Sequence, residues 1–95
     1  MENNEKVTKV VWTKQAQIAL NQILDYRYAE IPNARRIVRT DIINKSKSIT
    51  YPEQYPKDNI LSQYRRIIVR DYKIIYKSEK QVVYVMNVVC LLSEY

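Results

Sequence analysis

Hydrophobic and polar residues follow two different periods along the chain. In residues 7–12, VTKVVW, β-branched and aromatic residues alternate briefly with polar ones, which is typical of a strand. From residue 14 to about residue 28, apolar side chains recur every three or four positions, which is the period of an amphipathic helix. These positions are Ala16, Ala19, Leu20, Ile23 and Leu24, with Tyr26 or Arg27 at the end. Thr13 directly precedes this segment and is predicted to be its N-cap.

A second helix is predicted directly after the first. Pro32 interrupts the first periodic segment, and Asn33 is suited to cap a helix that runs from residue 34 to about residue 49. Because the connection is so short, the two helices should pack as an antiparallel hairpin. The residues expected on the buried side of the second helix are Ala34, Ile37, Val38, Ile42 and Ile49.

The remainder of the chain is interpreted as a loop followed by three strands. Residues 50–63, TYPEQYPKDNILSQ, contain two prolines and the turn-prone pair Asp58 and Asn59, so a loop is predicted. Strands are expected at about residues 64–70, 72–78 and 81–89, because β-branched residues and tyrosines dominate there. Tight turns at Arg70-Asp71 and Glu79-Lys80 should connect them.

Length and element order indicate one small α+β domain. A chain of 95 residues suffices for a single hydrophobic core, so residues 1–95 are interpreted as one domain with a polar tail at residues 1–6. The predicted fold is an N-terminal strand, a two-helix hairpin and a three-stranded antiparallel meander, with the helices packed on one face of a four-stranded sheet. No apolar run is long enough to span a membrane, and the first residues lack signal-peptide character. A cytoplasmic protein without a membrane partner is therefore expected.

Two residue types are missing, and their absence narrows the chemistry. The chain contains no histidine and no glycine. Without histidine a Ser-His-Asp or Cys-His pair is impossible, and without glycine neither a P-loop nor a dinucleotide fingerprint can form. A single cysteine, Cys90, provides neither an internal disulfide nor a cysteine-rich zinc site. We therefore expect no cofactor and no metal, and proton chemistry is left to Lys, Arg, Tyr and the carboxylates.

The positive charge is concentrated in two segments. Residues 33–49 carry five cations and one acid, and residues 64–77 carry the same, so each segment has a net charge of +4. Because the whole chain has a net charge of +6, the rest of the chain sums to −2. Charge that is localised in this way predicts an anionic partner. The candidate binding residues are Arg35, Arg36 and Arg39 in the second helix and Arg65, Arg66 and Arg70 in the first meander strand.

Side chains alternate between the faces of a strand, so the expected register sorts the meander into two surfaces. With Val69 opposite Tyr72 and Ser78 opposite Gln81, one face is mostly apolar and can bury the helices. It carries Arg65, Ile67, Val69, Tyr72, Ile74, Tyr76, Val83, Val85 and Asn87. The other face carries Arg66, Ile68, Arg70, Lys73, Ile75, Lys77, Val82, Tyr84, Met86 and Val88.

The second of these faces is expected to stay open to solvent. Its cations would then contact the oxygens of a phosphate-bearing ligand, which guanidinium groups can bind bidentately. The competing interpretation is a solvated face whose charges serve solubility alone. Neither turn contains glycine or asparagine, and longer turns would change the register and the sorting of these side chains.

Two strings in the sequence resemble the RelE/ParE superfamily of small bacterial toxins from type II toxin-antitoxin pairs, which includes plasmid stabilisation proteins. They are ALNQILDYRYAEIPNAR, residues 19–35, and YRRIIVRDYKIIYKSEKQVVYVMNVV, residues 64–89. The resemblance covers residues 7 to about 89. It implies a basic, growth-inhibiting toxin whose partner is a small, acidic or amphipathic antitoxin, and it leaves open whether the toxin is a homodimer.

The superfamily has two activities, and the resemblance alone leaves both open. ParE-like members bind and poison DNA gyrase. RelE-like members cleave messenger RNA on the ribosome, using cations on the exposed sheet face and a Tyr, His or Arg at the end of the last strand. That position here reads VCLL, residues 89–92, so the usual general acid is missing. Gyrase binding is therefore favoured, an endoribonuclease is the alternative, and a catalytically decayed toxin fold that acts only by binding is the third interpretation.

If the chain is an endoribonuclease, the candidate catalytic residues are Lys73, Lys77 and Tyr84. Attack by a ribose 2′-OH needs a base, an acid and stabilisation of the charge on the phosphorane. Lys73 matches the family's cation after the tyrosine that opens the second meander strand, and neighbouring cations would favour the neutral base form of either lysine. Tyr84 or Tyr95 would protonate the leaving group, although packing is the more ordinary role for Tyr84.

Overall fold

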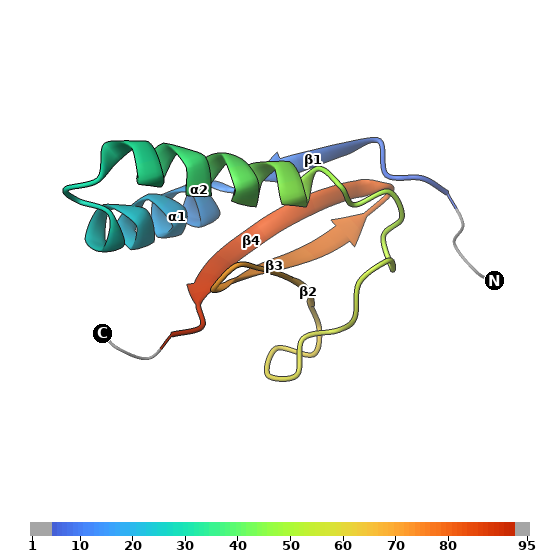
Figure 1. The fold of residues 1–95 in the computed structure, drawn as a ribbon. Helices are drawn as coiled ribbons and strands as arrows, with labels where there is room; N and C mark the ends of the chain where they lie inside the picture. The colour runs from blue at the N-terminus through green and yellow to red at the C-terminus, as the bar shows by residue number, and fades with distance from the viewer. Residues whose placement is uncertain (1–4, 93–95) are drawn as a thin grey trace.

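The computed structural model describes residues 5–92, so residues 1–4 of the expected polar tail and the candidate acid Tyr95 lie outside the described residues. The elements follow the predicted order (Figure 1). They are β1 (Lys9–Trp12), α1 (Lys14–Arg27), α2 (Pro32–Ser46), β2 (Arg65–Val69), β3 (Tyr72–Glu79) and β4 (Val82–Cys90).

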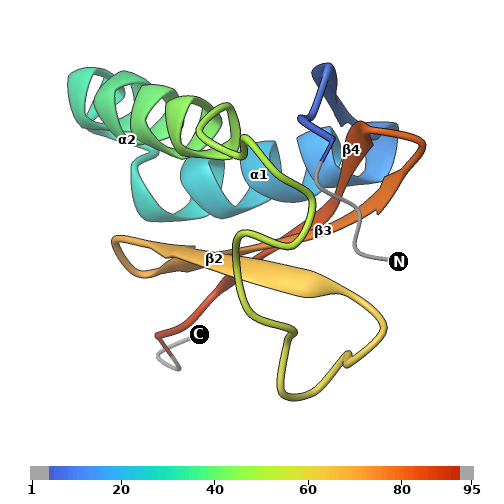
Figure 2. The ribbon, with the colours of Figure 1, turned by 90° about the vertical axis from the view of Figure 1, so that its right-hand side faces the viewer.

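The four strands form one mixed sheet in the order β1-β4-β3-β2. β2, β3 and β4 pair antiparallel as a meander, and β1 pairs parallel with β4. Both helices lie on one face of this sheet, as the two views show (Figures 1 and 2). The predicted α+β architecture, a helical hairpin on a four-stranded and mainly antiparallel sheet, is therefore confirmed.

The start of α1 follows the prediction from local chemistry. The Thr13 hydroxyl accepts a hydrogen bond from the Ala16 backbone N–H at 3.2 Å and donates one to the Val85 carbonyl at 2.7 Å. The N-cap therefore also fastens the helix to β4. Leu20 and Leu24 are fully buried, whereas Tyr26, at the end of the predicted apolar stripe, is 66% exposed.

The start of α2 differs from the prediction. Asn33 does not cap this helix; the helix begins at Pro32, and Ile31 precedes it without a side-chain cap. Proline suits the first turn because its missing N–H has no partner there in any helix. Val38 is buried as predicted, but Ile37 is 48% exposed. Adjacent helix positions are rotated by about 100°, so Ile37 and Val38 cannot both face the sheet.

The register of the meander agrees with the prediction at the first turn and departs from it later. Val69 lies opposite Tyr72 as expected, but the second turn is Lys80-Gln81, and a bulge separates Ile75 from Tyr76. A bulge inserts one residue and moves the following side chains to the opposite face. Beyond it, the predictions for two positions are wrong: Val88 packs in the core beside Cys90, and Asn87 does not belong to the core.

Both turns of the meander place residues other than glycine in the left-handed region. The φ angle is 53° at Arg70, 52° at Lys80 and 71° at Gln81. Tight hairpin turns need positive φ, and this chain has no glycine to supply it. The left-handed conformation costs an ordinary residue roughly 1–2 kcal/mol, so each of these turns stores backbone strain.

We expect Lys80→Asn to raise the free energy of unfolding by about 0.5–1 kcal/mol, because asparagine tolerates the left-handed region better than lysine. Urea unfolding of the purified protein measures this change. Lys80→Ala is the matched control, since alanine removes the same charge without relieving the strain. Equal stabilities for the Asn and Ala variants would contradict the strain argument.

Candidate functional site

The face of the sheet opposite the helices is covered by the segment between α2 and β2, residues 50–64, which we call the cover loop. Figure 2 shows this yellow-green segment passing from the helix layer to the other side of the sheet. Its carbonyls accept hydrogen bonds from the Tyr76 hydroxyl and the Arg65 guanidinium, to Pro52 at 3.1 Å and Tyr55 at 2.7 Å. The cover loop is therefore fastened to β2 and β3 along its length.

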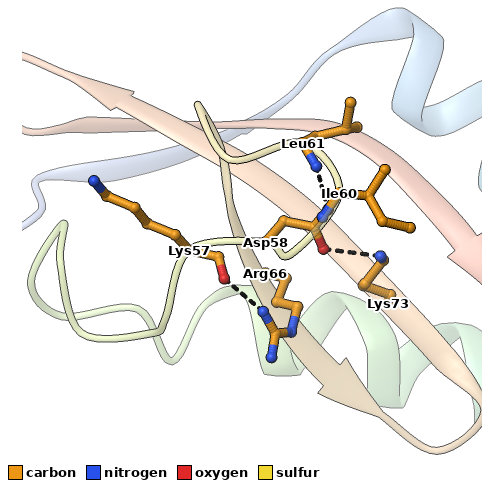
Figure 3. A network of polar contacts seen from close by, with 6 residues as sticks. All are labelled: Lys57, Asp58, Ile60, Leu61, Arg66 and Lys73. Atoms are coloured by element: carbon orange, nitrogen blue, oxygen red, sulfur yellow. Dashed lines mark hydrogen bonds and ion pairs between the residues drawn. The ribbon is translucent and has the colours of Figure 1, made fainter.

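A buried ion pair joins the cover loop to the centre of the sheet. Lys73 Nζ lies 2.8 Å from Asp58 Oδ1, and the two residues are 8% and 2% exposed (Figure 3). The second carboxylate oxygen accepts the backbone N–H groups of Ile60 at 3.1 Å and Leu61 at 2.8 Å. Lys73 is the largest cause that lowers the pKa of Asp58 to about 2, followed by the Leu61 N–H, while burial opposes them.

The expectation of a bare cationic face is therefore wrong at its centre. Lys73 is not open to a phosphate ligand, because Asp58 neutralises it and the cover loop shields it. Ile75, which points to the same face, is 1% exposed. A strand of alternating apolar and cationic residues indicated a solvated face, but here the loop supplies a second cover for β3.

Arg70 is also misplaced by the prediction. Its guanidinium Nε lies 2.8 Å from a carboxylate oxygen of Asp41, which belongs to α2. The side chain therefore reaches the helix side of the sheet and is neutralised there. The reason is the turn, because Arg70 occupies its left-handed position and no longer follows the alternation of β2.

Two of the three catalytic candidates do lie together. Lys77 on β3 pairs across the ladder with Tyr84 on β4. Both line a hollow of about 220 Å³ with Thr13, Glu79 and Met86. Lys77 Nζ is 3.6 Å from Glu79, so its charge is partly balanced. Lys73 does not line this hollow.

The six arginines that were predicted to bind an anion do not converge on one surface. Arg35 forms an ion pair with Asp25 at 2.8 Å, which joins the two helices. Arg36 and Arg39 are exposed on α2 and have no hydrogen bond or ion pair with any residue in the range 5–92. Arg65 and Arg66 donate to the neutral carbonyls of Tyr55 and Lys57, so no carboxylate balances their charges.

The comparisons with known proteins agree with this architecture. No family model matches the chain, and no curated protein matches it. Among solved structures, the fold is similar to a chain from the "Chromosomal ParDE TA system from P. aeruginosa", with a TM-score of 0.71 and 15% sequence identity. The match covers 88% of this chain and 96% of that chain. The resemblance to the RelE/ParE superfamily is thus confirmed at the level of the fold.

Asp58 is the residue that sequence reasoning missed. It was interpreted only as a turn former, although it neutralises a candidate catalytic lysine. Its sequence neighbours give no signal of this role, because the partner lies on a strand beyond a turn. In the described part of the chain, no helix has the length and apolar character of a membrane span, and no acidic or cysteine residues cluster as metal ligands.

We expect Asp58→Asn to lower the free energy of unfolding by about 3 kcal/mol at neutral pH, since it leaves Lys73 buried without a counter-charge. The folded-state pKa of Asp58 is depressed to about 2. The contribution of the carboxylate is therefore complete above its ordinary pKa near 3.9 and is lost as the pH falls towards 2. Urea unfolding between pH 2 and pH 7 should show the two proteins converging in acid.

The matched control for this experiment is Asp41→Asn, which removes the exposed carboxylate that pairs with Arg70. Exposed pairs contribute about 0–1 kcal/mol, so this variant should stay close to the wild type. A difference between Asp58→Asn and the wild type that does not change with pH would contradict the assignment to the ion pair.

Proposed function

We propose that the protein is the toxin half of a type II toxin-antitoxin module and that it inhibits growth in the cytoplasm by binding DNA gyrase. The observation that carries the proposal is the match of the fold to a chain from a ParDE toxin-antitoxin system over most of both chains. That likeness joins the RelE/ParE strings in the hairpin and the meander. Together they favour a toxin of this superfamily over an unrelated basic protein.

The state of Lys73 supports binding rather than RNA cleavage. This lysine stands where RelE-like members carry a sheet cation, but here it forms a buried pair with Asp58. A general base must reach the proton that it removes, within hydrogen-bond distance or through one water. The chain also has no histidine to serve as general acid. A mechanism of docking without chemistry fits these residues best.

The endoribonuclease stays the second candidate because of the hollow beside β4. Lys77 and Tyr84 face it together, and they supply a potential base and a potential acid. If neither activity is present, the fold is a decayed toxin that acts only by binding.

An antitoxin partner is part of this proposal. Arg36, Arg39, Arg65 and Arg66 carry charge that no carboxylate of residues 5–92 balances, and they suit a small acidic segment. Ile18 and Ile37 on the helices are 46% and 48% exposed, and they offer apolar contacts to an amphipathic one. Whether two copies also associate stays open.

We expect the purified protein to inhibit supercoiling of relaxed plasmid by purified gyrase and to increase the amount of trapped, cleaved DNA. The assay compares native protein with the same protein after irreversible heat denaturation. Unchanged supercoiling at an excess of native protein would rule out gyrase as the target.

The nuclease candidate gives a different result. Induced expression would then produce new messenger 5′ ends within codons, and Lys77→Ala or Tyr84→Phe should abolish them. Lys80→Ala, on the turn of the same hairpin, is the control and should leave the ends in place. Growth arrest with intact messenger RNA would reject cleavage.

A further inference from the structure

Two adjacent aliphatic residues project from the tip of the cover loop. Ile60 is 76% exposed and Leu61 is 39% exposed. Their backbone N–H groups both bind the Asp58 carboxylate, which is itself buried against Lys73 (Figure 3). The charged pair therefore lies inside and the aliphatic side chains lie outside, which inverts the usual arrangement of a surface loop.

This arrangement is not what stability alone would favour. Burying an ion pair roughly breaks even against apolar packing, and exposed aliphatic side chains gain nothing from folding. What the buried pair does provide is a fixed backbone at the tip. Asp58 N–H also binds the Tyr64 carbonyl at 2.9 Å, and Tyr64 N–H binds the Leu61 carbonyl at 2.8 Å. The tip is thus closed by hydrogen bonds on both sides.

We propose that Ile60 and Leu61 form a rigid knob that docks into an apolar pocket with an acidic rim on the target protein, DNA gyrase. The proposal rests on the function proposed above. The acidic rim is argued from charge: Lys57 is exposed beside the tip, and Arg65 and Arg66 are bound only to carbonyls of the loop. Cations around an apolar centre favour a partner with the opposite arrangement of charge.

The shape of the knob selects this occupant over two others. A projecting side chain needs a concavity on a folded surface, whereas an antitoxin helix is convex and would bind in a groove. A nucleic acid presents phosphates, and the cation on this face that would meet them, Lys73, is already neutralised by Asp58. The aliphatic pair adds nothing to phosphate binding.

The test measures inhibition of supercoiling by purified gyrase. Ile60→Ser should raise the concentration needed for half-inhibition about tenfold, as truncation of a central anchor does. Ile60→Met keeps an apolar side chain and should stay close to the wild type. Ile37→Ser removes an aliphatic residue of similar size that is 48% exposed on α2, and it should have no effect. Lys57→Gln should weaken inhibition more at low salt than at high salt.

Thermal unfolding of each variant shows whether its fold is intact. A weakened Ile60→Ser variant with a wild-type melting curve, together with unaffected Ile37→Ser, supports the knob. Equal inhibition by Ile60→Ser and the wild type overturns this inference and leaves the proposed function standing. A wild-type protein without any effect on gyrase overturns both, so the wild-type reaction distinguishes the two failures.

Discussion

The central strand β3 is buried on both faces, and much of the structure follows from this constraint. Residues 72–76 are at most 8% exposed. The helices cover one side, where Tyr72, Ile74 and Tyr76 pack, and the cover loop must shield the other side, where Ile75 and Lys73 point. A lysine in such a strand needs a counter-charge, because an isolated buried ammonium group is strongly unfavourable. Asp58 meets that need, and its position fixes the path of the loop.

The elements that could be predicted from sequence are those whose signals are local. The three-to-four residue period of α1 and the capping role of Thr13 both depend on neighbours within one helical turn. The first meander turn was also predictable, because Val69 and Tyr72 are separated only by the turn itself. In each case the deciding contact is short in sequence.

The features that could not be predicted depend on contacts between distant segments. The bulge beside Tyr76 changes which residues of β4 face the core, and nothing in the alternation of that strand announces it. The composition of residues 50–63 indicated a loop but not its path across the sheet. The candidate site was wrong at Lys73 for this reason: alternation gives the face of a side chain, not what covers that face.

The distribution of charge also changes once the fold is known. Five cations form ion pairs with carboxylates among residues 5–92, and they connect elements rather than attract a ligand. The excess positive charge is left on α2, at Arg36 and Arg39, and beside the cover loop. Two separate basic regions can engage two different partners, as expected for a protein that meets both a target and an inhibitor.

The parallel pairing of β1 with β4 has a consequence for biosynthesis. Thr8 and Gln81, which meet at the start of this ladder, are 73 residues apart in the chain. Translation at about 5–20 residues per second separates their appearance by roughly 4–15 s. During that interval the first strand has no neighbour to pair with, so the complete sheet cannot assemble on the ribosome until nearly all of the polypeptide has been made.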